Sequence, residues 1–358
     1  MSLAILAIVF SVLMLAAANG ANDVAKGVAT LLGSGIAKAR LAIIWGTAWT
    51  AVGGIVAAFW GTALLNNFVN GFLAVDFPMT LSFVISVIVG ACLWVALATR
   101  FGLPVSTTHA LLGGIVGAAL VTSGWPGLQL TAILQKAVLP LLLSPILAIV
   151  FCFAILLVSA WLRRQIPAWQ PGCCSKSDWR SDPFVCTEAS PRQLVMRRLW
   201  LALHWLSSGA TSFARGLNDV PKIAAFLVLA TSLSAQSVEY FDSSLTAIIL
   251  VTLAMAIGGL WGGFRVLKVL AHRITAMDAS QGLTANVGTA GVVLLASQFG
   301  LPVSTTHVST GALMGIRWAG RTLPKQTDAL LAIMLAWLVT LPVAAIFAAG
   351  MMRVSQLI

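Results

Sequence analysis

Charged side chains are scarce in this sequence. Only 9% of its 358 residues are Asp, Glu, Lys or Arg, whereas 59% are hydrophobic. Soluble domains carry about 25% charged residues, so this composition does not supply a water-facing surface for a chain of this length. The solvent for most of the chain is therefore lipid. Since one spanning helix needs roughly 20 apolar residues and several such runs are present, we predict an all-α, polytopic membrane protein.

Acidic residues are scarcer than basic residues. The chain has 10 Asp and Glu against 21 Lys and Arg, which gives a formal net charge of +11. We exclude nucleic-acid binding as the reason for this positive net charge, because the basic residues lie between apolar runs and not on one polar domain. Cytoplasmic loops of membrane proteins are enriched in Lys and Arg, so membrane topology explains the excess.

Cysteine is also sparse and points to no metal centre. Cys92 and Cys152 lie in apolar runs, where cysteine serves as a small packing residue. Cys173, Cys174 and Cys186 lie in a polar central segment, and their spacing matches no known ligand pattern. We predict no metal site, and the sequence assigns no role to the three central cysteines.

Two motifs occur twice in the chain. The nine residues Phe101–His109 recur identically as Phe299–His307, 198 positions later. The segment Asn22–Lys26 (Asn-Asp-Val-Ala-Lys) is matched by Asn218–Lys222 (Asn-Asp-Val-Pro-Lys), 196 positions later. Because the two offsets are nearly equal, the chain is predicted to contain two copies of one unit.

The predicted organisation is a transmembrane repeat at 1–162, a basic cytoplasmic linker at 163–198 and a second repeat at 199–358. In the first repeat, loops 66–78 and 123–131 contain no Lys or Arg and are placed outside. In the second repeat the basic loops fall at the opposite positions, as with Arg265, Lys268 and Arg273. This reversal predicts inverted-topology repeats, a common plan for secondary transporters.

The predicted topology has about 10–12 membrane segments, some of them broken or re-entrant, and both termini outside. We expect a multi-pass integral protein of a bacterial or archaeal cell membrane. A homodimer is left open.

The duplicated Gly-Leu-Pro-Val-Ser-Thr-Thr-His motif predicts an anion site. Gly102 and Pro104 interrupt the apolar run. Ser106, Thr107 and Thr108 then lie where a new half-helix would start, and Ser or Thr suits a helix N-cap. A helix N-terminus attracts anions through its free N–H groups and positive dipole end. Two copies meeting at the midplane would surround a tetrahedral oxyanion. The alternative is a proline-kinked helix whose hydroxyls bond to its own backbone, and His109 and His307 either orient the hydroxyls or only pack.

The Asn-Asp motifs place charges inside apolar runs. A charged side chain at mid-membrane costs about 2.5–3.5 kcal/mol on insertion scales, so Asp23 and Asp219 need partners or a polar cavity. Lys26 and Lys222 lie three residues further on, which puts each on the same helix face as its aspartate. These charges are therefore either structural pairs or part of the transport site.

Helix breaks are expected beside the Asn-Asp motifs. Gly20, Gly216 and Pro221 lie next to them, and non-helical backbone at membrane depth is tolerated where it lines a cavity. The polar residues of the segment 280–289, namely Ser280, Gln281, Thr284, Asn286 and Thr289, either line the pathway or join helices.

The motifs resemble those of a known family. Gly20–Ala25, Phe213–Val220, Leu283–Gly288 and the paired Gly-Leu-Pro-Val-Ser-Thr-Thr-His segments are similar to elements of the PiT family of inorganic phosphate transporters. The resemblance implies an inverted-repeat fold that binds phosphate between its halves and couples transport to sodium or protons. Carried over by position, the substrate site comprises Asn22, Asp23, Ser106, Thr107, Thr108, Asn218, Asp219, Ser304, Thr305 and Thr306.

The chain departs from the family pattern at three charged positions. Lys26 and Lys222 replace the second Asn of the family element, and Arg215 replaces its His. We assign these residues to charge balance or coupling, and we predict a proton in preference to sodium as the coupling ion. Phosphate donates a hydrogen bond to an Asp carboxylate and sulfate at neutral pH does not, but neutralisation of each Asp by Lys keeps sulfate open.

The predicted function is that of a secondary transporter for inorganic phosphate, proton-coupled and without a cofactor. A sulfate or other oxyanion permease of the same fold is the alternative, followed by an anion channel. We do not predict an enzyme, because the sequence has no nucleophile motif in a strand-turn-helix setting and no Gly-x-x-x-x-Gly-Lys motif. The predicted partners are the anion and the lipid bilayer.

Overall fold

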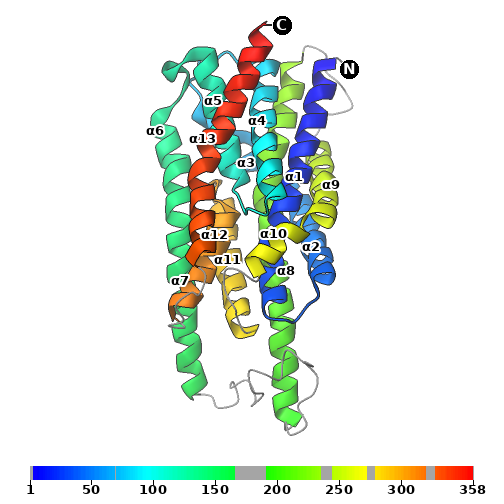
Figure 1. The fold of residues 1–358 in the computed structure, drawn as a ribbon, viewed down its shortest axis with the longest axis vertical. Coiled ribbons are helices and arrows are strands. Elements are labelled where there is room, and N and C mark those ends of the chain that lie inside the picture. The colour runs from blue at the N-terminus through cyan, green and yellow to red at the C-terminus, as the bar shows by residue number, and fades with distance from the viewer. Residues whose placement is uncertain are drawn as a thin grey trace.

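The computed structural model of this protein describes residues 3–68, 70–165, 191–234, 244–271, 279–319 and 327–357. Within these ranges the chain is almost entirely helical, and the one pairing of extended backbone joins Leu73 and Leu128. The long helices run close to the long axis of an elongated bundle (Figure 1). The all-α prediction is confirmed.

The central linker divides the helices into two groups along the chain. Before it lie α1 (Leu3–Gly33), α2 (Ala39–Trp60), α3 (Thr62–Asn67), α4 (Leu81–Arg100), α5 (Thr107–Ser123), α6 (Leu130–Ile133) and α7 (Leu139–Gln165). After it lie α8 (Pro191–Leu233), α9 (Ser244–Gly262), α10 (Phe264–Val269), α11 (Ala279–Gln298), α12 (Thr305–Ala319) and α13 (Thr327–Leu357).

Seven of the described helices are long and apolar enough to cross a membrane: α1, α2, α4, α8, α9, α13 and the stretch formed by α6 and α7. Many of their large apolar side chains face outward, including Leu142, Val150 and Leu338. Such a surface is stable in lipid and not in water. The prediction of a multi-pass integral membrane protein is confirmed.

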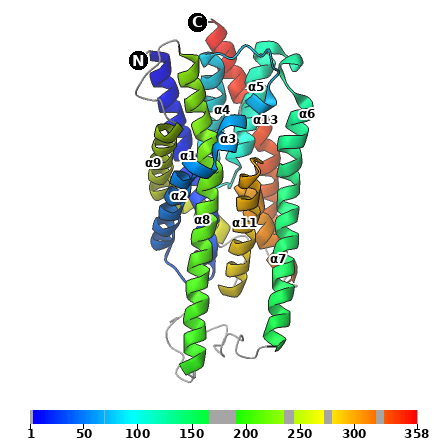
Figure 2. The same ribbon diagram turned by 180° about the vertical axis from the view of Figure 1, so that it is seen from behind.

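The two Asn-Asp motifs lie on helices of opposite direction. In Figures 1 and 2, α1 starts at the end of the bundle where both termini lie, whereas α8 starts at the opposite end and runs back toward it. An inverted repeat requires this antiparallel course. The inverted repeat itself, and the placement of both termini outside, stay predictions.

The predicted linker 163–198 contains the ends of two helices, and its boundaries stay a prediction. Because α7 continues to Gln165 and α8 begins at Pro191, residues 163–165 and 191–198 of the predicted linker are helical. The rest of it, including Cys173, Cys174 and Cys186, lies outside the described residues.

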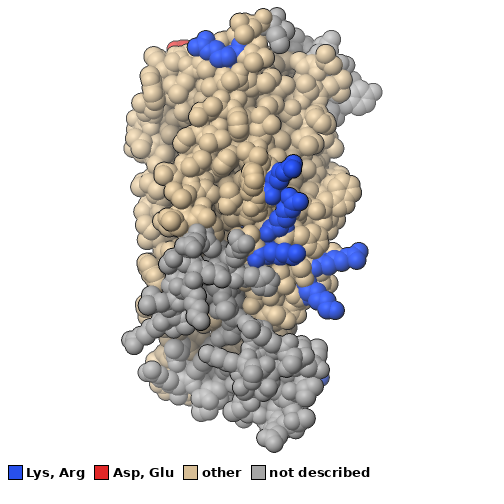
Figure 3. All heavy atoms as spheres, viewed as in Figure 1, with Lys and Arg blue, Asp and Glu red and all other residues tan. Residues whose placement is uncertain are grey.

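In Figure 3 most of the visible basic side chains lie on the right of the face, around and below its middle, and the surface above them is largely free of charged residues except at the top edge. Exposed basic residues of the described chain include Lys38, Arg40, Arg100, Arg265 and Lys268. Enrichment of Lys and Arg at the ends of spanning helices is typical of the cytoplasmic side of membrane proteins.

The helix breaks expected at the Asn-Asp motifs are absent from the structure, so that prediction was wrong. Helix α1 runs unbroken through Gly20, and α8 runs unbroken through Gly216 and Pro221. A methyl group at Gly20 would collide with the backbone carbonyl of Met255 in α9, and one at Gly216 with that of Thr50 in α2. These glycines allow helices to pack closely and do not mark chain breaks.

The breaks occur at the other motif, as predicted. Helix α4 ends at Arg100 and α5 begins at Thr107, and the same interruption separates α11 from α12. Gly102 and Gly300 turn the chain with φ values of 72° and 64°, a conformation that glycine adopts without steric cost. Each break therefore directs the start of a half-helix into the bundle.

Candidate anion-binding site

Each serine of the duplicated motif caps a half-helix. The Ser106 Oγ accepts a hydrogen bond of 3.2 Å from the backbone N–H of His109, and the Ser304 Oγ accepts one of 3.3 Å from that of His307. This is the N-cap interaction expected of serine. The prediction that half-helices α5 and α12 start at this motif is confirmed, and Thr107 and Thr305 form their buried first residues.

The two motifs meet at the centre of the bundle. The Thr108 hydroxyl donates to the carbonyl oxygen of Val303 at 3.3 Å, and the Thr306 hydroxyl donates to that of Val105 at 2.7 Å. Each of these threonines thus donates to the opposite half. The kinked-helix alternative required hydroxyls that donate to the backbone of their own helix, and these two do not. The imidazole rings of the motif histidines also pack against each other, with centroids 4.6 Å apart, and His307 Nδ1 lies 3.5 Å from the Leu141 carbonyl oxygen.

The charges of the Asn-Asp motifs form two buried ion pairs. The Lys26 ammonium pairs with Asp23 Oδ1 and donates to the Val105 carbonyl at 3.0 Å. The Lys222 ammonium lies 3.4 Å from Asp219 Oδ1. Buried charges persist when they are paired and hydrogen-bonded in this way, so the lysines neutralise both aspartates.

The second pair also reaches across to the first motif. Lys222 Nζ donates to the Thr108 hydroxyl at 2.8 Å and to the Val303 carbonyl at 3.1 Å. Val303 is the repeat counterpart of Val105, the residue whose carbonyl binds Lys26. The same set of carboxylate and motif carbonyl therefore holds an ammonium group in each half.

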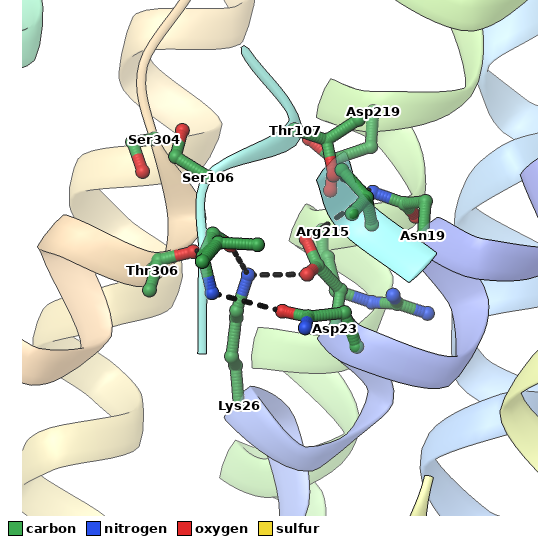
Figure 4. Close-up of polar contacts among 12 residues, drawn as sticks. Asn19, Asp23, Lys26, Ser106, Thr107, Arg215, Asp219, Ser304 and Thr306 are labelled. Atoms are coloured by element: carbon green, nitrogen blue, oxygen red, sulfur yellow. Dashed lines mark hydrogen bonds and ion pairs between the residues drawn. The ribbon is translucent and has the colours of Figure 1, made fainter. Parts of the chain in front are cut away.

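The centre carries a surplus of positive charge. Five charged side chains of the described chain are buried: Asp23, Asp219, Lys26, Lys222 and Arg215, of which the last has 2% exposure. Three of these side chains are cations and two are carboxylates. Figure 4 shows four of them, Asp23, Asp219, Lys26 and Arg215, near Ser106, Ser304 and Thr306. A buried surplus of one positive charge next to two half-helix N-termini favours an anion.

Asn22 ties α1 to the first motif segment. Its Nδ2 donates to the Thr99 hydroxyl and to the Leu103 carbonyl, each at 2.9 Å, and its Oδ1 accepts from the backbone N–H of Val105 at 3.1 Å. The amide of Asn22 is thus fully used in holding the segment between α4 and α5. Its contact with substrate stays a prediction.

Asn218 has the corresponding task in the second half. Its Nδ2 donates to the Val303 carbonyl at 3.2 Å and to Asp219 Oδ1 at 2.9 Å, and its Oδ1 accepts from the Ser297 hydroxyl at 3.3 Å. The two asparagines therefore position the motif segments against the helices that carry the aspartates.

One site residue, Asn19, was missed by the sequence analysis. Its Nδ2 donates to Asp23 Oδ2 at 3.2 Å and to the Thr107 hydroxyl at 2.8 Å, so it links α1 to the start of α5. Figure 4 shows it beside these partners. The repeat offset of 196 residues, from 19 to 215, pairs Asn19 with Arg215 and would have identified it.

Asn286 joins three helices next to this centre. Its Oδ1 accepts from the Thr30 hydroxyl at 3.1 Å, its Nδ2 donates to the Ser207 hydroxyl at 3.2 Å, and its carbonyl accepts from Thr211 at 2.9 Å. A small cavity beside it is lined by residues that include Lys26, Thr30, Asn286, Thr289 and Ser309. Asn286 therefore joins helices and also lines a cavity.

Known proteins of similar sequence are named as phosphate transporters. The chain is 30% identical over 338 residues to a "Probable low-affinity inorganic phosphate transporter" of Mycobacterium leprae, covering 91% of this chain and 72% of the relative. It is 26% identical over 331 residues to a protein of the same name from Rhizobium meliloti, covering 92% and 90%. The similarity extends over both halves.

A solved structure described as "The sodium-dependent phosphate transporter" has the same fold, with a TM-score of 0.83 and full coverage of both chains at 24% identity. This likeness contradicts the prediction that a proton, in preference to sodium, is the coupling ion. The prediction rested on the ammonium groups of Lys26 and Lys222. Their pairing with Asp23 and Asp219 fixes the charge at these two carboxylates and does not identify the coupling ion.

The match to a family model covers nearly the whole chain. The model of the phosphate transporter family matches residues 19–348, which include both Asn-Asp motifs, both half-helix motifs and the charged centre between them. The chain therefore belongs to the phosphate transporter family.

Proposed function

We propose that this protein moves inorganic phosphate across the membrane and binds it where the two half-helices α5 and α12 begin. The observation that supports this most directly is the crossing of the two motifs, in which Thr108 bonds to Val303 and Thr306 to Val105. Two positive helix ends converge there beside a surplus of buried positive charge. The proposed substrate site is the set predicted from sequence, extended by Asn19 and Arg215.

Alternating access is the proposed mechanism. The serine and threonine residues of the two motifs are 1–5% exposed, so an anion at the centre is separated from water on both sides. Hydrogen bonds across the two halves are the contacts that change if one half rocks against the other. A saturable carrier is therefore favoured over a channel, which needs a continuous water path.

Sodium is proposed as the coupling ion, because this protein shares its fold with the solved structure described as a sodium-dependent phosphate transporter. Replacement of sodium by choline in the uptake medium should then reduce phosphate uptake into proteoliposomes at least tenfold. Undiminished uptake in choline would remove sodium from the proposal and leave phosphate transport standing.

Radiolabelled phosphate uptake into proteoliposomes tests the substrate. We expect saturable uptake that unlabelled phosphate abolishes and equimolar sulfate leaves intact. Sulfate is the second candidate, because Lys26 and Lys222 already neutralise the two aspartates. Robust sulfate uptake without phosphate uptake would overturn the proposal in favour of a sulfate permease.

A further inference from the structure

Arg215 is a buried cation with unused hydrogen-bond donors. Its Nη2 donates to the Thr50 hydroxyl at 2.8 Å. Its Nε and Nη1 have no partner among the residues that the structure describes, although the side chain is buried. A buried donor without a partner is costly, and more so when it is charged. This guanidinium is therefore suited to a ligand with several oxygen acceptors.

Asp219 has an unused acceptor in the same centre. Its Oδ1 accepts from Asn218 at 2.9 Å and lies 3.4 Å from the Lys222 ammonium, whereas its Oδ2 is buried and has no partner in the described part of the chain. Asp23 differs, because its Oδ1 binds Lys26 and its Oδ2 binds Asn19. Only the second of the two carboxylates thus offers a free oxygen.

The unused donors and the unused acceptor do not satisfy each other. The charges of Arg215 and Asp219 interact electrostatically. In the described part of the chain, however, the ion pairs of Asp23 and Asp219 at 4.0 Å or less are those to Lys26 and Lys222, and Arg215 is not in such a pair. Figure 4 shows Arg215 and Asp219 on the same side of the crossing motif segments, together with Asp23. A ligand between them would need oxygens that accept from Arg215 and one group that donates to Asp219.

We propose that Arg215 and Asp219 together select a protonated oxyanion, with Arg215 donating to its bare oxygens and Asp219 Oδ2 accepting from its hydroxyl. This inference rests on the proposed phosphate transport and identifies how the site distinguishes phosphate from sulfate. Both phosphate ions present at neutral pH retain at least one P–OH group, and arsenate does likewise. Sulfate has no hydroxyl and would place an oxygen lone pair against the Asp219 carboxylate, leaving that acceptor unpaired.

Competition binding to the purified full-length protein tests this inference. Binding of radiolabelled phosphate in detergent is measured against arsenate and sulfate, so that each protein reports a ratio independent of how much of it is folded. In the unchanged protein, arsenate should compete within about threefold of phosphate and sulfate at least 100-fold more weakly. Equal competition by sulfate would overturn the proposal without any variant.

Two substitutions separate the roles. Asp219→Asn replaces the acceptor by an amide that can donate to sulfate, so the preference for phosphate over sulfate should fall at least tenfold. Arg215→Gln should weaken phosphate binding at least tenfold, because charge-assisted hydrogen bonds are lost. Arg215→Lys retains the charge but not the fork of donors, and its binding should be intermediate.

Matched substitutions at exposed positions serve as controls. Asp76→Asn and Arg265→Gln make the same chemical changes at exposed residues and should leave affinity and competition ratios unchanged. If Asp219→Asn keeps the full preference against sulfate, or Arg215→Gln binds phosphate normally, the inference is wrong while the proposed function stands. If the unchanged protein binds no phosphate at all, the proposed function itself fails.

Discussion

Equivalent positions in the two halves hold different polar side chains. Asn19 and Arg215 are separated by the 196-residue repeat offset. Asn19 is bound to Asp23 and Thr107, whereas Arg215 is bound, among the residues that the structure describes, to Thr50 alone. Among the described residues, Asn19 keeps only its Oδ1 without a partner, whereas Arg215 keeps Nε and Nη1 and Asp219 keeps Oδ2. Two halves that share sequence motifs can therefore differ in the polar groups that they offer a ligand.

The largest difference between the halves should follow removal of their lysines. Lys222 bonds to Thr108 of the other half, whereas the bonds of Lys26 in the described part of the chain stay within its own half. Breaking a buried ion pair by removing one partner costs about 3–5 kcal/mol. We expect Lys222→Met to abolish phosphate uptake and Lys26→Met to retain more of it, with both lowering the thermal unfolding temperature in detergent.

Exposed Lys268 provides the control for this pair, since Lys268→Met should change neither uptake nor stability. Equal losses of uptake in Lys222→Met and Lys26→Met would show that the bond across the halves adds nothing to transport.

Asn19 and Arg215 should also differ in how much they contribute to the stability of the fold. Asn19→Leu removes the donor to Asp23 and Thr107 and leaves two buried acceptors unpaired, at about 1–3 kcal/mol each. We expect a clear fall in unfolding temperature, whereas Arg215→Gln should change unfolding much less than binding. A destabilisation by Arg215→Gln as large as that by Asn19→Leu would contradict the division of roles.

The packing glycines should behave alike, because they occupy equivalent positions. Gly20→Ala and Gly216→Ala each place a methyl group against a backbone carbonyl, of Met255 and Thr50 respectively. Overpacking of this kind costs about 1–3 kcal/mol. We expect similar falls in unfolding temperature for both variants, and none for Gly350→Ala, where nothing lies within 4 Å of the added carbon. Unequal falls would mean that the two helix crossings differ.

The smallest expected effects concern the crossing threonines. Thr306→Val removes one neutral hydrogen bond, to the Val105 carbonyl, worth about 0.5–1.5 kcal/mol. Thr108→Val removes the corresponding bond to Val303 and also an acceptor for Lys222, so its effect on phosphate uptake should be the larger. The reverse order would place the more important contact in the second motif.

Local chemistry made part of this site predictable from sequence. The half-helix starts could be inferred because the break and the N-cap are encoded within a few residues, Gly102 to Thr107. The Asp-Lys pairs could be inferred for the same reason, since their members lie one helical turn apart.

Contacts between distant segments were not predictable in this way. Gly20 and Gly216 suggested helix breaks because their packing partners, Met255 and Thr50, lie far away in the sequence. Asn19 was missed because its partner Thr107 is 88 residues away. The coupling ion was misjudged because charge neutralisation of Asp23 and Asp219 does not say which ion drives transport.

The crossed threonine bonds bear on how such a protein originated. Thr108 completes its hydrogen bond on a residue of the second half, and Thr306 completes its own on a residue of the first. If the two halves arose from a half-length ancestor, that ancestor could have formed these bonds only with a second copy of itself. Gene duplication and fusion would then have joined an existing two-chain site, after which position 215 was free to diverge from position 19.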